Sequence, residues 1–130
     1  AVDFVSDKLN CKRTIPLKVS GAFHSPFMSK AADEFSLRLD DVSFNEAKYP
    51  VLSNADPTPS IDGNLLKERL KCQMISGVRW RETMKNLENL AVETLLEIGP
   101  GKVLTGLAKR SMKGVNLNQI SSSNDLGHSS

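Results

Sequence analysis

The sequence predicts an α/β fold with a mainly parallel sheet. Strand-like segments at residues 14–20, 50–54, 94–98 and 115–120 alternate with segments in which apolar residues recur every three or four positions, as on one face of a helix. With 130 residues, 39% hydrophobic and 25% charged, the chain has the length and composition of one globular domain with a buried core. Parallel sheets of this kind form their sites at the carboxyl ends of strands.

The composition argues against several classes of function. No apolar run approaches the length of a membrane helix, and a net charge of +2 with only 5% aromatic residues gives little for a nucleic acid to bind. Cys11 and Cys72 lie far apart without a metal-ligand motif, so we expect neither a zinc site nor a disulfide. The first residues have the pattern of the middle of a helix, and we therefore expect the chain to begin inside a larger protein.

Two elements and a helix start are predicted in the first third of the chain. Residues 1–9 have helical spacing, and residues 14–20 alternate apolar and polar side chains as a half-buried strand does. Ser25 is placed to cap the next helix, with Pro26 in its first turn. The apolar face of that helix comprises Met28, Ala31, Ala32, Phe35, Leu39 and Val42.

A short buried strand at residues 50–54 is followed by a loop with two prolines, and a helix is predicted to begin between residues 61 and 64. Its apolar stripe contains Leu66, Leu70 and Met74. The same spacing puts the amide of Gln73 on the buried face, where it requires partners. Periodicity alone favours the alternative that Gln73 caps its own helix or bonds to backbone.

The last third of the chain has the clearest pattern. A helix is predicted over residues 78–90 with Trp80 as a core anchor, then a strand at 94–98, a helix from 103 to 112 and a last strand at 115–120. The final ten residues are rich in Ser, Asn, Asp and Gly, and we expect a disordered tail at 121–130.

His24 is the leading candidate for catalysis. It lies between the strand at 14–20 and the following helix, and imidazole is the side chain best suited to accept and return a proton near neutral pH. A core or surface histidine without a catalytic role is the alternative. No Gly-x-Ser-x-Gly elbow provides a nucleophile, and Gly127-His128-Ser129-Ser130 lacks the strand, second glycine and helix of such an elbow.

Two further features suggest binding. Residues 99–102 (GPGK) join a strand to a helix and would present backbone N–H groups to a phosphate, although a purely structural turn is the favoured interpretation. Four cations on or near the last helix would suit an acidic partner or a phosphorylated cofactor, and a solvated face is the alternative. They are Lys102, Lys109, Arg110 and Lys113.

Three motifs together resemble one known family. They are residues 19–28 (VSGAFHSPFM), Gln73 with residues 78–80 (VRW), and residues 97–104 (EIGPGKVL) followed by Gly106-Leu107 and Lys109-Arg110. In this order and spacing they resemble the carboxyl-terminal part of malonyl-CoA:acyl-carrier-protein transacylase. The resemblance covers residues 1 to about 120.

The resemblance implies an α/β-hydrolase-like large subdomain with an inserted ferredoxin-like subdomain. Residues 1–19 would end the insert, and residues 20–120 would belong to the large subdomain. It further implies a ping-pong transfer in which a serine takes malonyl from coenzyme A and passes it to the phosphopantetheine thiol of acyl carrier protein. His24 would be the general acid/base, and the backbone carbonyl of Gln73 would orient it. No resident cofactor is implied.

The family's nucleophile elbow, oxyanion loop and carboxylate-binding arginine would all precede residue 1. None of Arg13, Arg38, Arg79 and Arg81 matches that arginine. The chain alone is therefore expected to be inactive and to need the missing amino-terminal part as a partner. A carrier-protein docking module and a fragment without a role are the alternatives. The resemblance also implies a cytoplasmic location, or a plastid or mitochondrial one in a eukaryote, and Phe23 before His24 suggests a preference for malonyl.

Overall fold

A computed structural model describes residue 8 and residues 21–127. The predicted helix at 1–9 (apart from Lys8) and the predicted strand at 14–20 lie outside these residues. The elements in order are η1 (Pro26–Met28), α2 (Ser29–Asp40), α3 (Gly63–Cys72), α4 (Trp80–Asn89), β1 (Thr94–Ile98), α5 (Val103–Ser111), β2 (Asn116–Ile120) and η2 (Ser123–Gly127). The α/β class is therefore confirmed for this part of the chain.

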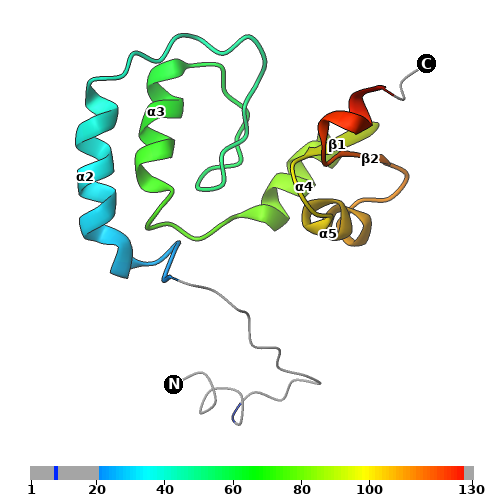
Figure 1. The fold of residues 1–130 in the computed structure, drawn as a ribbon, viewed down its shortest axis with the longest axis horizontal. Helices are drawn as coiled ribbons and strands as arrows, with labels where there is room; N and C mark the ends of the chain where they lie inside the picture. The colour runs from blue at the N-terminus through cyan, green and yellow to red at the C-terminus, as the bar shows by residue number, and fades with distance from the viewer. Residues whose placement is uncertain (1–7, 9–20, 128–130) are drawn as a thin grey trace.

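The described elements form two groups. In Figure 1, α2 and α3 lie side by side, while α4, α5 and the two strands gather in the other half. Strands β1 and β2 form a parallel two-stranded sheet with Thr94 opposite Asn116 and Ile98 opposite Ile120, joined through α5. The described sheet is parallel, as the alternation of strands and helices in the sequence predicted.

The larger core lies in the α4, α5 and sheet half. Met84, Ala108 and Met112 are buried there, and Trp80, Leu87, Leu95, Val115 and Leu117 pack around them. Trp80, Met84 and Leu87 recur at helical spacing on α4, which explains why this face meets the sheet and α5. Trp80 is thus a core anchor, as its position in the sequence predicted.

The α2 and α3 pair is held by a smaller core and by charged side chains. Ala32 and Leu39 are the buried residues of α2. The Lys67 ammonium of α3 donates to the backbone carbonyls of Asp40 and Val42, at distances of 3.1 and 3.0 Å. These carbonyls lie at and just beyond the end of α2, where the helix has no further N–H to bond them, so Lys67 satisfies acceptors that would otherwise need water.

The predicted strand at residues 50–54 is wrong. Val51 makes a single antiparallel bridge with Ser60, and its side chain is exposed. The segment turns at once, because the Ser53 N–H donates to the Asp56 carbonyl and two prolines follow. It is a loop that packs beside α3.

Beyond residue 120 the chain forms the short 3-10 helix η2, which lies within the segment predicted as a disordered tail. The carboxylate of Asp125 accepts the backbone N–H groups of Ser121 and Ser122, each at 2.8 Å, and η2 forms around it. Such local hydrogen bonds from a carboxylate to nearby backbone N–H groups stabilise a turn. Residues 128–130 lie outside the described part.

Candidate active site

His24 occupies the turn that leads into η1. Its backbone has a φ of 62°, in the left-handed region, which is uncommon for a residue with a side chain. The His24 N–H donates to the Met74 carbonyl at 2.9 Å, and the imidazole Nδ1 lies 3.0 Å from the Gln73 carbonyl oxygen. Two consecutive carbonyls at the end of α3 therefore hold both the backbone and the ring of His24.

The Gln73 carbonyl determines which ring nitrogen carries the proton. A carbonyl oxygen can only accept, so Nδ1 must donate and Nε2 keeps its lone pair in the neutral ring. Gln73 is also the C-cap of α3. The contact therefore places His24 at the end of this helix with Nε2 unoccupied by the Gln73 carbonyl.

Gln73 contributes to this contact through its main chain. Its own N–H donates to the Leu70 carbonyl, as expected for the end of a helix. Its half-buried side chain lines a separate cavity of about 430 Å³ between α3 and residues 44–54. Gln73 therefore ends its own helix, which is the alternative that periodicity favoured. The residue as a whole is half-buried.

Ser25 precedes η1 but does not cap it with its side chain. The Ser25 hydroxyl instead donates to the Ala22 carbonyl at 2.6 Å. Pro26 begins the 3-10 turn, and its ring provides no N–H that a cap would need to satisfy. Ser25 therefore occupies the predicted N-cap position, but its hydroxyl stabilises the turn that carries His24 instead of capping η1.

The glycine turn at residues 99–102 leads into a helix whose first turn is already bonded to a carboxylate of the protein. Gly99 and Gly101 have φ values of 138° and 98°, which residues with side chains rarely adopt. The carboxylate of Glu97 accepts the N–H groups of Leu104 and Thr105 at 3.0 and 2.7 Å, and it also accepts the Thr105 hydroxyl. The amino terminus of α5 thus binds a buried side-chain anion, which supports the structural interpretation of the turn.

Glu97 should make stability depend on pH. The hydroxyl and N–H of Thr105, and then the N–H of Leu104, hold the pKa of Glu97 below its ordinary value. A lowered pKa in the folded state stabilises the fold above the ordinary glutamate pKa, and the contribution is lost as pH falls through the lowered value. Urea unfolding should therefore show Glu97→Gln to be less stable than the wild type at pH 7. The difference should shrink below about pH 4, and a constant difference across this range would contradict the assignment.

The four candidate cations do not form one cluster. Lys102 is the N-cap of α5, whereas Lys109 and Arg110 lie in its last turn and Lys113 follows it. Lys109 and Lys113 line one cavity of about 670 Å³. Arg110 lines another, of about 730 Å³, together with Arg81 and Lys85 of α4 and the carboxylates Glu82 and Glu88.

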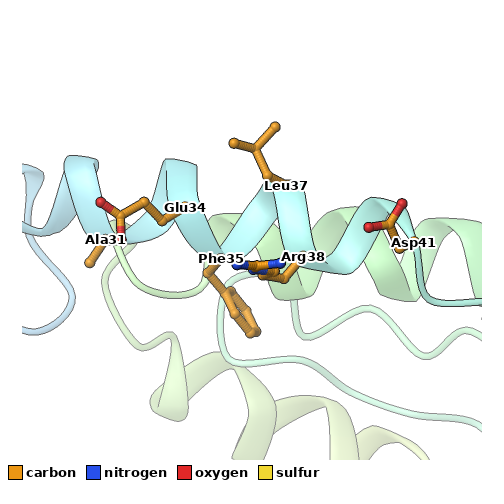
Figure 2. Close-up of a pocket in the computed structure, with 6 residues that line it drawn as sticks. All are labelled: Ala31, Glu34, Phe35, Leu37, Arg38 and Asp41. Atoms are coloured by element: carbon orange, nitrogen blue, oxygen red, sulfur yellow. The ribbon is translucent and has the colours of Figure 1, made fainter.

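A further hollow of about 620 Å³ follows the outside of α2 and is lined by Glu34, Phe35, Arg38 and Asp41, among others. Figure 2 shows Phe35 and Leu37 on opposite sides of this helix. His24 does not line this hollow.

Among the described residues no group of three or more His, Cys, Asp and Glu side chains could hold a metal ion, and none of the helices is long and apolar enough to cross a membrane.

The burial of two charged side chains, Arg69 and Glu97, was not predicted from the sequence. Glu97 interrupts an apolar strand, and Arg69 lies three residues after Leu66 and four before Gln73 on the same face of α3. A charge on an otherwise apolar stripe was the available signal, because such a residue must find a partner inside the fold.

The comparisons with known proteins agree on one enzyme. The chain is 48% identical over 125 residues to the malonyl CoA-acyl carrier protein transacylase of Synechocystis sp., covering 96% of this chain and 43% of that protein. The crystal structure of a Synechocystis malonyl-CoA:ACP transacylase aligns with a TM-score of 0.90 over 97% of this chain and 43% of that chain. No family model matches the chain.

A second solved structure is a malonyl-transacylase in complex with its type II PKS acyl-carrier protein. It is 33% identical and has a TM-score of 0.84, covering 95% of this chain and 40% of that one. These matches define the chain as part of an α/β transacylase. It is a homologue of the malonyl CoA-acyl carrier protein transacylases of fatty acid biosynthesis, and it spans about two fifths of the length of the relatives it matches.

Proposed function

We propose that this chain is the carboxyl-terminal part of a malonyl-CoA:acyl-carrier-protein malonyltransferase, and that His24 is its general acid/base. The hydrogen bond between His24 Nδ1 and the Gln73 carbonyl carries the proposal, because it leaves Nε2 free to take a proton. The nucleophilic serine belongs to the part of the enzyme that precedes this chain.

The proposed reaction has two halves. In the first, Nε2 of His24 takes the serine hydroxyl proton as the serine oxygen attacks the malonyl thioester, and it returns the proton to the departing coenzyme A thiolate. In the second, Nε2 takes the proton of the phosphopantetheine thiol, whose sulfur attacks the malonyl ester, and returns it to the serine oxygen. Gln73 holds the ring in one tautomer through both halves.

The requirement for a further part of the enzyme has support in the exposed apolar surface. Phe27 and Ile98 have 91% and 76% of their surface exposed, and β1 pairs on one edge only among the described residues. A two-stranded parallel sheet with an open apolar edge is marginally stable and prone to aggregation, because its backbone N–H and C=O groups are unpaired and its apolar side chains face water. The rest of the transacylase is the proposed cover for this surface.

Carrier protein and coenzyme A thioester are the proposed substrates, with Phe23 beside His24 favouring malonyl. The cations Lys109, Arg110 and Lys113 are exposed, and they would suit an acidic carrier protein. If docking is the chain's whole role, charge reversal at these cations abolishes a salt-sensitive interaction with carrier protein while His24→Ala has no effect.

Reconstitution tests the proposed function. The purified chain alone should transfer no malonyl from coenzyme A to carrier protein, because it lacks the nucleophile. Adding the separately produced amino-terminal part of the enzyme should restore transfer, and adding that part to a His24→Ala chain should not. Transfer by the chain alone would contradict the proposal, as would equal restoration by both chains.

A further inference from the structure

Arg69 is one of two charged side chains that are buried in the described part of the chain. Its guanidinium is 7% exposed, and Nη1 donates to the Thr58 carbonyl at 2.7 Å. Nη2 forms an ion pair with the Asp56 carboxylate at 2.6 Å. Hydrogen bonds from Thr58, and then the Arg69 charge, hold the pKa of Asp56 below its ordinary value, so the carboxylate remains ionised at neutral pH.

The loop that accepts these hydrogen bonds from Arg69 is also hydrogen-bonded to α4 and to the residue before it. The Asn54 carbonyl accepts the Arg79 N–H at 2.9 Å, and the Pro57 carbonyl accepts Nδ2 of Asn86 at the same distance. Residues 54–58, which we call the 54–58 loop, are therefore bonded to α3 on one side and to α4 on the other.

No other described contact joins the two halves as directly. Helix α3 packs on α2, while α4 packs on α5, which contacts the sheet. Among the described residues, residues 73–79 connect the halves along the chain, and the hydrogen bonds of the 54–58 loop connect them across it. A change at the loop would thus alter the placement of α3 against the sheet.

Arg69 lies four residues, about one turn, before Gln73 on α3. The Gln73 carbonyl in turn determines the tautomer and direction of the His24 ring. We propose that Arg69 is a positioning residue, which ties the end of α3 to the 54–58 loop and so fixes the His24 and Gln73 pair relative to the sheet. The inference rests on the proposed function for its kinetic consequence, but its structural consequence is independent of it.

The geometry explains why an arginine stands here. The two acceptors are a carbonyl and a carboxylate two residues apart, and a planar guanidinium reaches both with separate nitrogens. The Nε is buried without a hydrogen-bond partner, so the two terminal nitrogens make both contacts. A lysine would retain the charge but would bind through a single nitrogen, and we expect it to replace only part of the function.

The test compares Arg69→Met with Lys71→Met in the complete enzyme that contains this chain. Lys71 is a matched control, because it lies on the same helix and pairs with Asp40 and Glu68 without contacting the 54–58 loop. We expect Arg69→Met to lower kcat for malonyl transfer about tenfold with little change in KM, because misplacing a reacting group slows the chemical step more than it weakens binding. Lys71→Met should change kcat less than twofold.

A second readout reports on the ring without requiring catalysis. The 15N chemical shifts of His24 should show a proton on Nδ1 in the wild type and in Lys71→Met, and a mixture of tautomers in Arg69→Met. Wild-type shifts and wild-type kcat in a folded Arg69→Met enzyme would overturn the inference. Absence of transfer activity in the wild type would count against the proposed function alone, because the tautomer comparison would still test Arg69.

Two further variants distinguish loss of the Arg69 contacts from a general folding defect. Arg69→Lys should fold and give a kcat between those of the wild type and Arg69→Met, and a wild-type kcat would contradict the two-acceptor argument. Asp56→Asn combined with Arg69→Met should lose no more than Arg69→Met alone, since the two side chains act through one contact. Additive losses would contradict the proposed role of the Arg69–Asp56 ion pair.

Discussion

Replacing His24 by glycine lowers kcat for malonyl transfer by about 10² to 10⁴-fold in the complete enzyme, the range that a general acid/base contributes. Glycine is the informative replacement. His24 has a φ of 62°, which glycine adopts without strain, so the variant loses the imidazole while the backbone conformation is retained. The measurement is steady-state transfer from malonyl-CoA to carrier protein, normalised to folded enzyme.

Two comparisons isolate the role of the ring. Free imidazole should restore part of the activity of His24→Gly, because it can enter the vacated site and accept the proton. His128→Ala removes the only other histidine in the sequence and should leave kcat unchanged. A His24→Gly enzyme with wild-type kcat would remove His24 from the mechanism.

Replacing Gly63 by alanine destabilises the fold by about 1 to 3 kcal/mol, as overpacked sites do. A Cβ built at Gly63 would lie 2.5 Å from the carbonyl oxygens of both Phe44 and Asn45. These are backbone atoms, so they cannot rotate away as a side chain can. Either the loop or the first turn of α3 must move. Urea unfolding measures the loss, and kcat should fall as well, because α3 carries Gln73 at its other end.

Gly77→Ala is the matched control for Gly63→Ala. No atom lies within 4 Å of a Cβ at Gly77, so the free energy of unfolding should change by no more than about 0.5 kcal/mol. Equal losses in the two variants would show that the close approach at Gly63 is not the cause.

The sequence predicted best those elements that depend on local periodicity. Helix α4, strand β1, helix α5 and strand β2 lie within a residue or two of their predicted bounds, because each combines a clear apolar pattern with a turn at its end. The segment at residues 50–54 has the apolar residues of a strand, but within the described part of the chain its one bridge is to Ser60, and pairing is a property of the fold.

The candidate site depended much more on distant contacts. His24 and Gln73 are separated by 49 residues, and no spacing rule connects a loop histidine to a carbonyl at the end of a later helix. The family resemblance supplied that pairing as an expectation, and the geometry has the two groups at hydrogen-bond distance. At residues 99–102 the favoured structural interpretation needed only a local contact, since the carboxylate at the start of α5 comes from Glu97 in the preceding strand.

The most direct test of the account is to locate the malonyl group on the enzyme. Brief incubation of the complete enzyme with malonyl-CoA, followed by digestion and mass spectrometry, identifies the residue that carries the ester. We expect the ester on a serine outside residues 1–130. In His24→Gly we expect the ester to form about 10²-fold more slowly. An ester on Ser25 or another residue of this chain, or one that forms equally fast without His24, would contradict it.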